Sequence, residues 1–120
     1  TPATSGVISR AACNAANELK AAAIVSSTKS GATARRISQC RPECPIVAVT
    51  PSEKVAKSLA FCFGVYPVVA EDQNSTDAMM ANATKIAVEN GFANSGDTVV
   101  IAAGLDQVGS TNLLKVSVVE

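Results

Sequence analysis

The residues with the clearest chemical potential lie in a hydroxyl-rich segment at 26–33, Ser-Ser-Thr-Lys-Ser-Gly-Ala-Thr. It places five hydroxyl groups, the cation of Lys29 and the flexible backbone of Gly31 between an apolar run and a helical pattern. Helix N-termini attract anions, because their first N–H groups lack helical partners and lie at the positive end of the helix dipole. The segment therefore predicts a phosphate-binding loop. The alternative is an ordinary Ser/Thr-rich helix cap and turn.

A second loop rich in Gly, Ser and Thr spans residues 104–112. Its glycine spacing is that of a nucleotide P-loop, but the Lys is missing and a strand pattern rather than a helix follows. A nucleoside-triphosphate site is therefore rejected for this loop. We expect it either to close over a ligand held by the first loop or to be an ordinary solvent loop.

The composition excludes several classes of function. The chain has 120 residues and no His, so His-based acid/base catalysis, His-dependent triads and most zinc-enzyme sites cannot be built from it. Ten basic and ten acidic residues cancel, which argues against a general nucleic-acid or anionic-membrane surface. The charge is nevertheless uneven, because residues 1–60 hold eight Lys and Arg against three Asp and Glu. This surplus indicates either an anion-binding end, assisted by Arg35 and Arg36, or solvated helix charges.

The four cysteines show no CxxC spacing, and the acidic residues form no cluster of the kind that binds Mg²⁺, so no metal site is expected. The cysteines are Cys13, Cys40, Cys44 and Cys62. The favoured interpretation is reduced, structurally placed thiols in a cytoplasmic protein. A redox pair of Cys40 and Cys44 is the alternative, although Pro42 between them disfavours a shared helix face.

Alternating helices and strands must position these segments. Apolar periodicity predicts helices at 5–20, 32–40, about 51–63 and 76–90. The third of these helices is expected to start at a Thr50 cap, with Pro51 in its first position and Glu53 completing a capping box, and to stop at Gly64. Strands are predicted at 23–25, 46–49, 65–69, 98–102 and 114–119.

Two details indicate how these strands are arranged. Pro67 cannot donate a ladder hydrogen bond, so the third strand is expected near a sheet edge. The link before the last strand is too short for a parallel crossover, so this strand is expected to be antiparallel. The predicted fold is one α/β domain over residues 1–120, with three layers: a five-stranded, mostly parallel sheet and helices on both faces.

Short segments spread along nearly the whole chain also carry a family resemblance. They are 28–35 (TKSGATAR), 41–50 (RPECPIVAVT), 64–68 (GVYPV), 75–77 (STD), 95–100 (SGDTVV) and 109–116 (GSTNLLKV). In this order they resemble the C-terminal domain of pyruvate kinase, the regulatory and oligomerisation domain of that glycolytic enzyme. The likeness is greatest to bacterial members.

The resemblance implies that the chain binds a sugar phosphate or another phosphorylated effector, with sulfate or phosphate able to take its place. The phosphate ligands implied are Thr28, Lys29, Ser30, Gly31, the N–H of Ala32, and Thr33. Gly109 and Ser110 are implied to close over the effector. The family also forms homo-oligomers through these domains, in some members by pairing of the last strands, here about 114–119.

Two departures from the family pattern bear on the effector. Animal-type members hold a second phosphate with a Trp and an Arg, whereas this chain has no Trp and no Arg at residues 77–80. The closing loop is also about one residue shorter than the bacterial pattern. These departures argue against fructose bisphosphate as the effector and favour a monophosphorylated sugar, AMP or an inorganic anion as alternatives.

The resemblance also implies where the catalysis resides. The family binds Mg²⁺, K⁺ and phosphoenolpyruvate on a barrel domain that has no counterpart among these residues. We therefore expect no catalytic residue and no cofactor here, and a partner in the chain's own catalytic domain. The alternatives are a purely structural subunit-interaction domain with a vestigial effector site and, less favoured, an independent small enzyme. A first residue Thr1 rather than Met is consistent with a detached domain.

Overall fold

Helices and strands alternate along the chain in the computed structural model, which describes residues 2–28, 31–71, 76–103 and 113–119. The elements are, in order, α1 (Pro2–Leu19), β1 (Ala23–Ser27), α2 (Ala32–Gln39), β2 (Ile46–Thr50), α3 (Glu53–Leu59), β3 (Val65–Val69), α4 (Thr76–Glu89), β4 (Thr98–Ala103) and β5 (Leu113–Val118). The predicted α/β class is confirmed.

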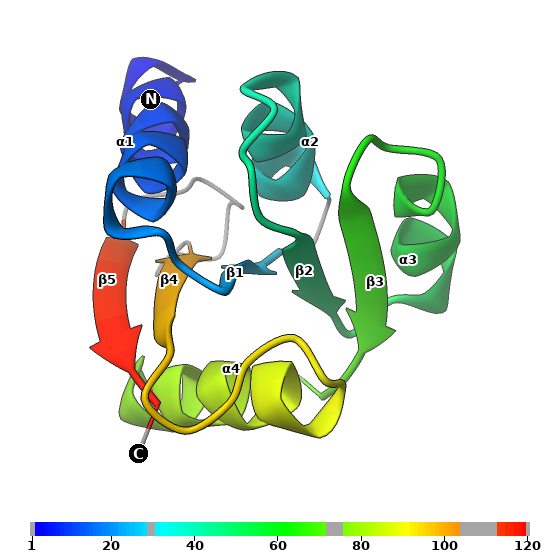
Figure 1. Cartoon of the computed structure of the whole chain (residues 1–120). Coiled ribbons are helices and arrows are strands. Elements are labelled where there is room, and N and C mark those ends of the chain that lie inside the picture. Colours follow the sequence, from blue (N-terminus) through cyan, green and yellow to red (C-terminus); the bar gives the residue numbers. More distant parts are fainter. Residues whose placement is uncertain (1, 29–30, 72–75, 104–112, 120) are drawn as a thin grey trace.

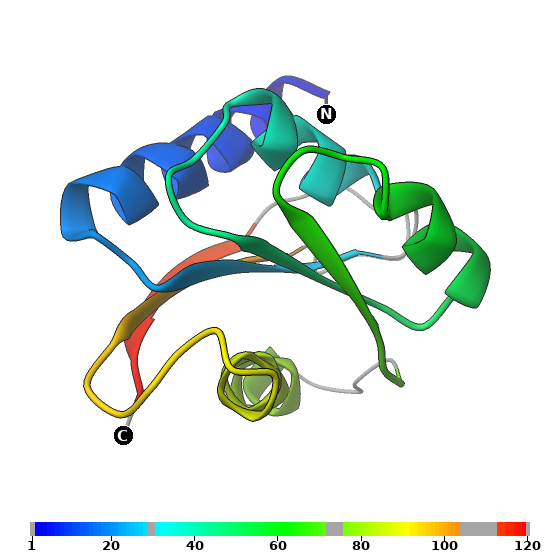
Figure 2. The same cartoon turned by 45° about the vertical axis from the view of Figure 1, so that its right-hand side comes forward.

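The strands form one five-stranded sheet in the order β3-β2-β1-β4-β5. The pairs β2–β3, β1–β2 and β1–β4 are parallel, and β5 runs antiparallel to β4. Helices α1, α2 and α3 cover one face of the sheet, and α4 covers the other (Figures 1 and 2). The antiparallel last strand and the edge position of β3, which contains Pro67, are both confirmed.

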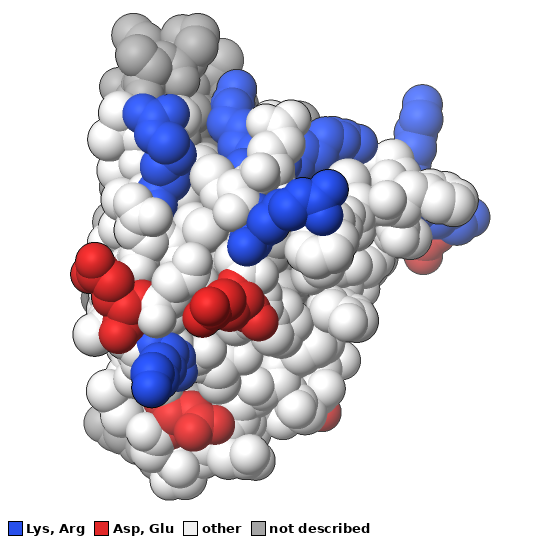
Figure 3. Space-filling model, turned by 45° about the horizontal axis from the view of Figure 1, so that its top comes forward, with Lys and Arg blue, Asp and Glu red and all other residues white. Residues whose placement is uncertain are grey.

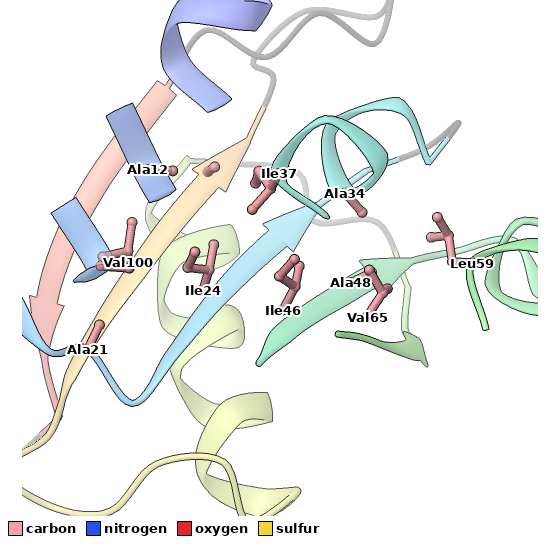
Figure 4. Packing of buried hydrophobic residues seen from close by; sticks show 12 residues of the cluster. Ala12, Ala21, Ile24, Ala34, Ile37, Ile46, Ala48, Leu59, Val65 and Val100 are labelled. Atoms are coloured by element: carbon pink, nitrogen blue, oxygen red, sulfur yellow. The ribbon is translucent and has the colours of Figure 1, made fainter. Parts of the chain in front are cut away.

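Small and branched side chains fill the core on the face covered by α1, α2 and α3. Ile37 of α2 lies over the sheet near Ile24 and Ile46, and all three side chains are fully buried (Figure 4). Alanines fill many of the remaining positions in this cluster: Ala12, Ala16, Ala21, Ala34, Ala48 and Ala102. Because alanine is short, it lets a helix lie close to the sheet, so α2 is held tightly against β1 and β2.

The opposite face of the sheet packs against α4. Alternate residues of a strand point to opposite faces, so the residues next to Ile24 and Ile46 in their strands face this helix. Val25 and Val47 share a buried cluster with Met80, Ala83 and Ile86. The spacing of Met80, Ala83 and Ile86 places all three on one side of α4.

The third helix differs from its prediction at both ends. It begins at Glu53 rather than just after Thr50, and the Oγ of Ser52 caps it by accepting a hydrogen bond of 3.2 Å from the N–H of Val55. Thr50 is instead the last residue of β2 and is fully buried. The helix ends at Leu59, several residues before Phe63. Strand pairing extends through Thr50, so the cap moves two residues along the chain.

Candidate anion-binding site

The first predicted loop follows β1, where the sheet has its topological switch point: β2 is added on one side of β1 and β4 on the other. From β1 the chain crosses to β2 through α2 on one face, whereas it returns to β4 through α4 on the other face (Figure 2). Ligands of open α/β sheets bind beyond the carboxyl ends of the strands at such a switch point. Ser27 at the end of β1 pairs with Ala103 at the end of β4. Both predicted loops therefore start from adjacent strand ends at this position.

Backbone and hydroxyl groups fix the two ends of the first loop. The N–H of Thr28 donates to the carbonyl of Val49 at 2.9 Å. The Oγ1 of Thr28 accepts a hydrogen bond of 2.8 Å from the N–H of Gly31. The carbonyl of Gly31 in turn accepts from the N–H of Arg35 at 3.0 Å, which begins the hydrogen bonding of α2. A hydroxyl that accepts a bond still has its hydrogen to donate, so Thr28 can donate to a phosphate oxygen.

Gly31 occupies a position where only glycine fits without strain. Its φ of +91° is left-handed, a region that side chains other than glycine adopt at a cost. An added Cβ would lie 2.7 Å from Nη1 of Arg35 and 3.3 Å from side-chain carbons of Val55 and Leu59. The backbone of the loop is therefore packed directly against α3 and against the Arg35 side chain.

Arg35 is oriented by the neighbouring helix. Its Nη2 donates to the Oγ of Ser58 at 2.8 Å, and the hydroxyl of Ser58 donates to the carbonyl of Val55 at 2.7 Å. This arrangement holds a guanidinium against the backbone of Gly31. Arg36, in contrast, lies in the last turn of α2. The sequence indicates Arg35 and Arg36 as residues that could assist anion binding. Of these two, Arg35 is the one that the structure places against the loop.

Positive charge gathers on the same side of the molecule. Figure 3 shows Lys and Arg side chains mainly in one half of the face formed by the helices α1–α3, with most of the acidic side chains below them. The basic residues on these helices and their ends are Arg10, Lys20, Arg35, Arg36, Arg41, Lys54 and Lys57. Of these residues, Arg35 contacts the loop at the switch point, whereas Lys20 and Arg41 follow the C-terminal ends of α1 and α2 at the opposite end of the sheet.

Comparison with known proteins decides the family. A sequence profile described as "Pyruvate kinase, alpha/beta domain" matches residues 7–117. This chain belongs to the pyruvate kinase alpha/beta domain family. The resemblance to the C-terminal domain of pyruvate kinase is thereby confirmed.

Individual pyruvate kinases are similar over most of this chain. The enzyme of Clostridium acetobutylicum is 48% identical over 119 residues, which are 98% of this chain and 25% of that protein. The enzyme of Staphylococcus epidermidis is 48% identical over 103 residues, which cover 84% of this chain and 18% of that protein. A Staphylococcus aureus enzyme is 46% identical over the same lengths. The chain thus spans a quarter or less of the pyruvate kinases that it matches.

In this pyruvate kinase domain, four of the predicted phosphate ligands lie together at the start of α2. They are Thr28, Gly31, Ala32 and Thr33. Thr28 and Thr33 are 8% and 2% exposed, and the Thr28 hydroxyl accepts the hydrogen bond from Gly31 inside the turn. The remaining predicted ligands, Lys29, Ser30, Gly109 and Ser110, lie outside the described residues.

The prediction that five hydroxyl groups lie in the loop at 26–33 is wrong for two of them. Ser26 and Ser27 belong to β1, which is longer than the predicted strand 23–25. Ser26 is fully buried, and its Oγ has no hydrogen-bond partner among the residues that the structure describes. Hydrogen bonds to β2 and β4 carry the strand through both serines, so Ser26 faces the core and is not a loop ligand.

Ser58 is a site residue that the sequence analysis missed. It lies 23 residues after Arg35, and nothing in its local sequence distinguishes it from any other helix serine. Only the packing of α3 beside α2 brings the two side chains together.

The described residues form neither a metal-binding cluster nor a membrane-spanning helix. Among the described residues, no group of three or more His, Cys, Asp or Glu side chains is arranged to hold a metal ion. None of the helices in that part of the chain combines the length and apolar character required to cross a membrane.

Proposed function

We propose that this chain is the regulatory domain of a pyruvate kinase and binds a phosphorylated effector at residues 28–33. The observation that carries the proposal is the turn between Thr28 and Gly31, which lies at the switch point of the sheet with the Arg35 guanidinium against it. In the full enzyme, phosphoenolpyruvate and ADP would be converted to pyruvate and ATP on a separate catalytic domain, which would hold the Mg²⁺ and K⁺.

The chemistry of the loop suits a phosphate monoester. Thr28 supplies a hydroxyl donor, α2 supplies the positive end of its dipole, and Arg35 supplies a fixed cation. Lys29 and Ser30 add a second cation and a second hydroxyl between these fixed ends. Gly109 and Ser110, on the loop that follows β4, would cover the rest of the effector.

Regulation by such an effector requires two arrangements of the subunits. An effector shifts the balance between them only if it binds one arrangement more tightly than the other.

Two substitutions in the loop region are expected to weaken binding of a phosphate ligand. Ser30→Ala and Arg35→Gln should each raise the Kd about tenfold, because hydrogen bonds to charged groups contribute about 1.5–3 kcal/mol and 1.4 kcal/mol is tenfold. Calorimetric titration with inorganic phosphate, AMP, a monophosphorylated sugar and fructose bisphosphate measures the Kd values.

Matched controls separate the site from general charge and hydroxyl effects. Arg36→Gln removes the same charge one residue along, in the last turn of α2. Ser95→Ala removes an exposed hydroxyl before the amino end of β4, at the opposite end of the sheet. Both controls should bind as the wild type does. The site assignment fails if none of these ligands binds, or if the loop variants and the controls bind alike.

Exposed valines on the edge strand β5 favour a second role, the association of two copies of this domain. Val116 and Val118 are 45% and 59% exposed, and an edge strand also presents unpaired N–H and C=O groups. Leu19, 51% exposed, lies at the same end of the sheet. The chain just after Leu19 is joined to this end of the sheet, because the N–H of Ala22 donates to the carbonyl of Thr98, and Thr98 is the β4 partner of Val118. We propose that β5 strands of two copies pair along this edge.

A lysine on β5 should prevent this association. Val118→Lys replaces an apolar side chain at the paired edge with a charge and should raise the dissociation constant of the dimer about tenfold, since burying a valine contributes about 1.5–3 kcal/mol and 1.4 kcal/mol is tenfold. Light scattering over a range of protein concentrations measures the mass. The control is Val69→Lys, at a residue 49% exposed on the opposite edge strand β3, which should remain dimeric.

The outcome also separates the two proposed roles. A wild-type chain that stays monomeric at high concentration contradicts pairing through β5. Dimers that bind no phosphate ligand would instead support the purely structural interaction domain.

A further inference from the structure

Two cysteines far apart in the sequence meet where α1 passes the C-terminal end of α2. Cys13 lies in α1, and Cys40 is the C-cap residue of α2, 27 positions further along. The thiol of Cys13 donates to the carbonyl of Cys40 with an Sγ···O distance of 3.6 Å. Burial raises the pKa of Cys13, and the charge and hydrogen bond of the Cys40 thiol raise it further. The Cys13 sulfur therefore lies against the backbone of the residue that carries the Cys40 thiol.

This pair is not the one that the sequence suggested. Sequence spacing pointed to Cys40 and Cys44 as the alternative to inert thiols, whereas the structure brings Cys40 to Cys13. Cys44 packs against the core cluster that contains Ile24 and Ile46, and its pKa is raised mainly by burial and to a smaller degree by Cys13. All four cysteines are reduced in the structure.

The surroundings hold Cys13 in position beside Cys40. The side-chain amide of Asn17, one turn further along α1, contacts the Cys13 sulfur at 3.9 Å. The Oδ1 of Asn17 accepts a hydrogen bond of 3.0 Å from the N–H of Glu43, in the segment after Cys40. This residue therefore ties the chain that follows α2 to α1, which keeps the two thiols in register.

The two thiols differ in their access to solvent. Cys13 is 3% exposed, whereas Cys40 is only partly buried. A small oxidant arriving from solvent therefore meets Cys40 first. Cys13 is almost completely shielded from such an oxidant.

We propose that Cys40 and Cys13 form a reversible oxidation site, in which a peroxide oxidises Cys40 and Cys13 then resolves it as a disulfide. In the first step the Cys40 thiolate attacks one peroxide oxygen, the O–O bond breaks, and the products of hydrogen peroxide are a sulfenic acid and water. In the second step the Cys13 sulfur attacks the Cys40 sulfur, the S–O bond breaks, and a second water leaves. Two thiols and one hydrogen peroxide thus become one disulfide and two waters, and a dithiol reductant restores both thiols.

The disulfide would join two of the helices on one face of the sheet. It would link the middle of α1 to the end of α2, and α2 begins at the residues proposed to bind phosphate. The inference does not depend on phosphate binding, because the thiols lie at the opposite end of α2.

Peroxide treatment of the folded chain, followed by alkylation and peptide mapping, tests the proposal. The number of alkylated thiols should fall from four to two, with a linked peptide containing Cys13 and Cys40, and a dithiol should restore all four. Cys40→Ser should abolish the linked peptide. Cys44→Ser and Cys62→Ser, which remove the other two thiols, should leave it unchanged.

Trapping of the sulfenic acid tests whether Cys13 is the thiol that attacks Cys40, because a variant that merely packs poorly would not accumulate a sulfenic acid on Cys40. In Cys13→Ala the sulfenic acid has no partner, so Cys40 should be labelled by dimedone, which traps sulfenic acids. A peptide linking Cys40 to Cys44, dimedone on Cys62 in place of Cys40, or four thiols remaining after peroxide would overturn the proposal. Circular dichroism of each variant establishes that the comparison is made between folded chains.

Discussion

Replacing Gly31 with alanine is expected to lower the free energy of unfolding by about 3 kcal/mol and to abolish measurable phosphate binding. A left-handed backbone costs a residue with a side chain about 1–2 kcal/mol. Added atoms in a packed environment cost about 1–3 kcal/mol more. At this position the new Cβ would lie 2.7 Å from Nη1 of Arg35, so the guanidinium must move away from the loop. Urea unfolding measures the stability, and calorimetry measures the binding.

Gly64→Ala is the matched control for this substitution. Gly64 also has a positive φ, +69°, but within the described part of the chain no other atom lies within 4 Å of an added Cβ. It should lose only about 1 kcal/mol, from backbone strain alone, and should bind phosphate normally. Equal losses at the two glycines would mean that Arg35, Val55 and Leu59 move aside freely, which contradicts a rigid support of the loop.

Leu59→Ala is the second substitution with a large expected effect. Leu59 is fully buried on α3 and supports the loop from below, with its Cδ2 3.3 Å from the position of a Cβ on Gly31. Truncation of a buried leucine costs about 2–5 kcal/mol through lost transfer energy and the cavity that remains. We expect about 3 kcal/mol in urea unfolding, together with weaker phosphate binding.

A larger side chain two residues further along is the control for Leu59. Phe61 is 92% exposed, so Phe61→Ala should change the stability by less than about 0.5 kcal/mol. In the double variant Gly31→Ala/Leu59→Ala, the cavity accommodates part of the added methyl group. The combined loss should therefore be smaller than the sum by about 0.5–1 kcal/mol, as for residues in contact. Strict additivity, or an equally large loss at Phe61, would contradict this account of the packing.

The sequence was most informative where a local rule coincided with the global fold. Apolar periodicity predicted the order of helices and strands, Pro67 predicted an edge strand, and the short link before β5 predicted an antiparallel strand. The structure confirms all three predictions. Two of the errors, at the ends of β1 and β2, occur where neighbouring strands extend the pairing beyond the local pattern. Thr50 and Ser26 are typical cap or loop residues, yet the ladders of β1, β2 and β4 include them in the sheet.

The candidate site was only partly predictable for a related reason. The Thr28 to Thr33 segment is contiguous, so its hydroxyls, its glycine and its place before a helix can be recognised from the sequence alone. The bond between Arg35 and Ser58, and the contact between Cys13 and Cys40, depend on how two helices lie on the sheet. Residue types and spacing along the chain do not specify that packing.

The two edges of the sheet differ in a way that limits how copies of this domain can assemble. The edge strand β3 contains Pro67, which pairs with Ala48 on its inner side and has no N–H to offer a further strand. Among the described strands, β5 is the one edge strand without proline. Antiparallel pairing of two β5 strands is self-complementary, so it consumes the same surface on both molecules and closes with two-fold symmetry. If copies pair through β5 as proposed, each would use its one proline-free described edge, and the result would be a closed pair with a continuous sheet rather than an open filament.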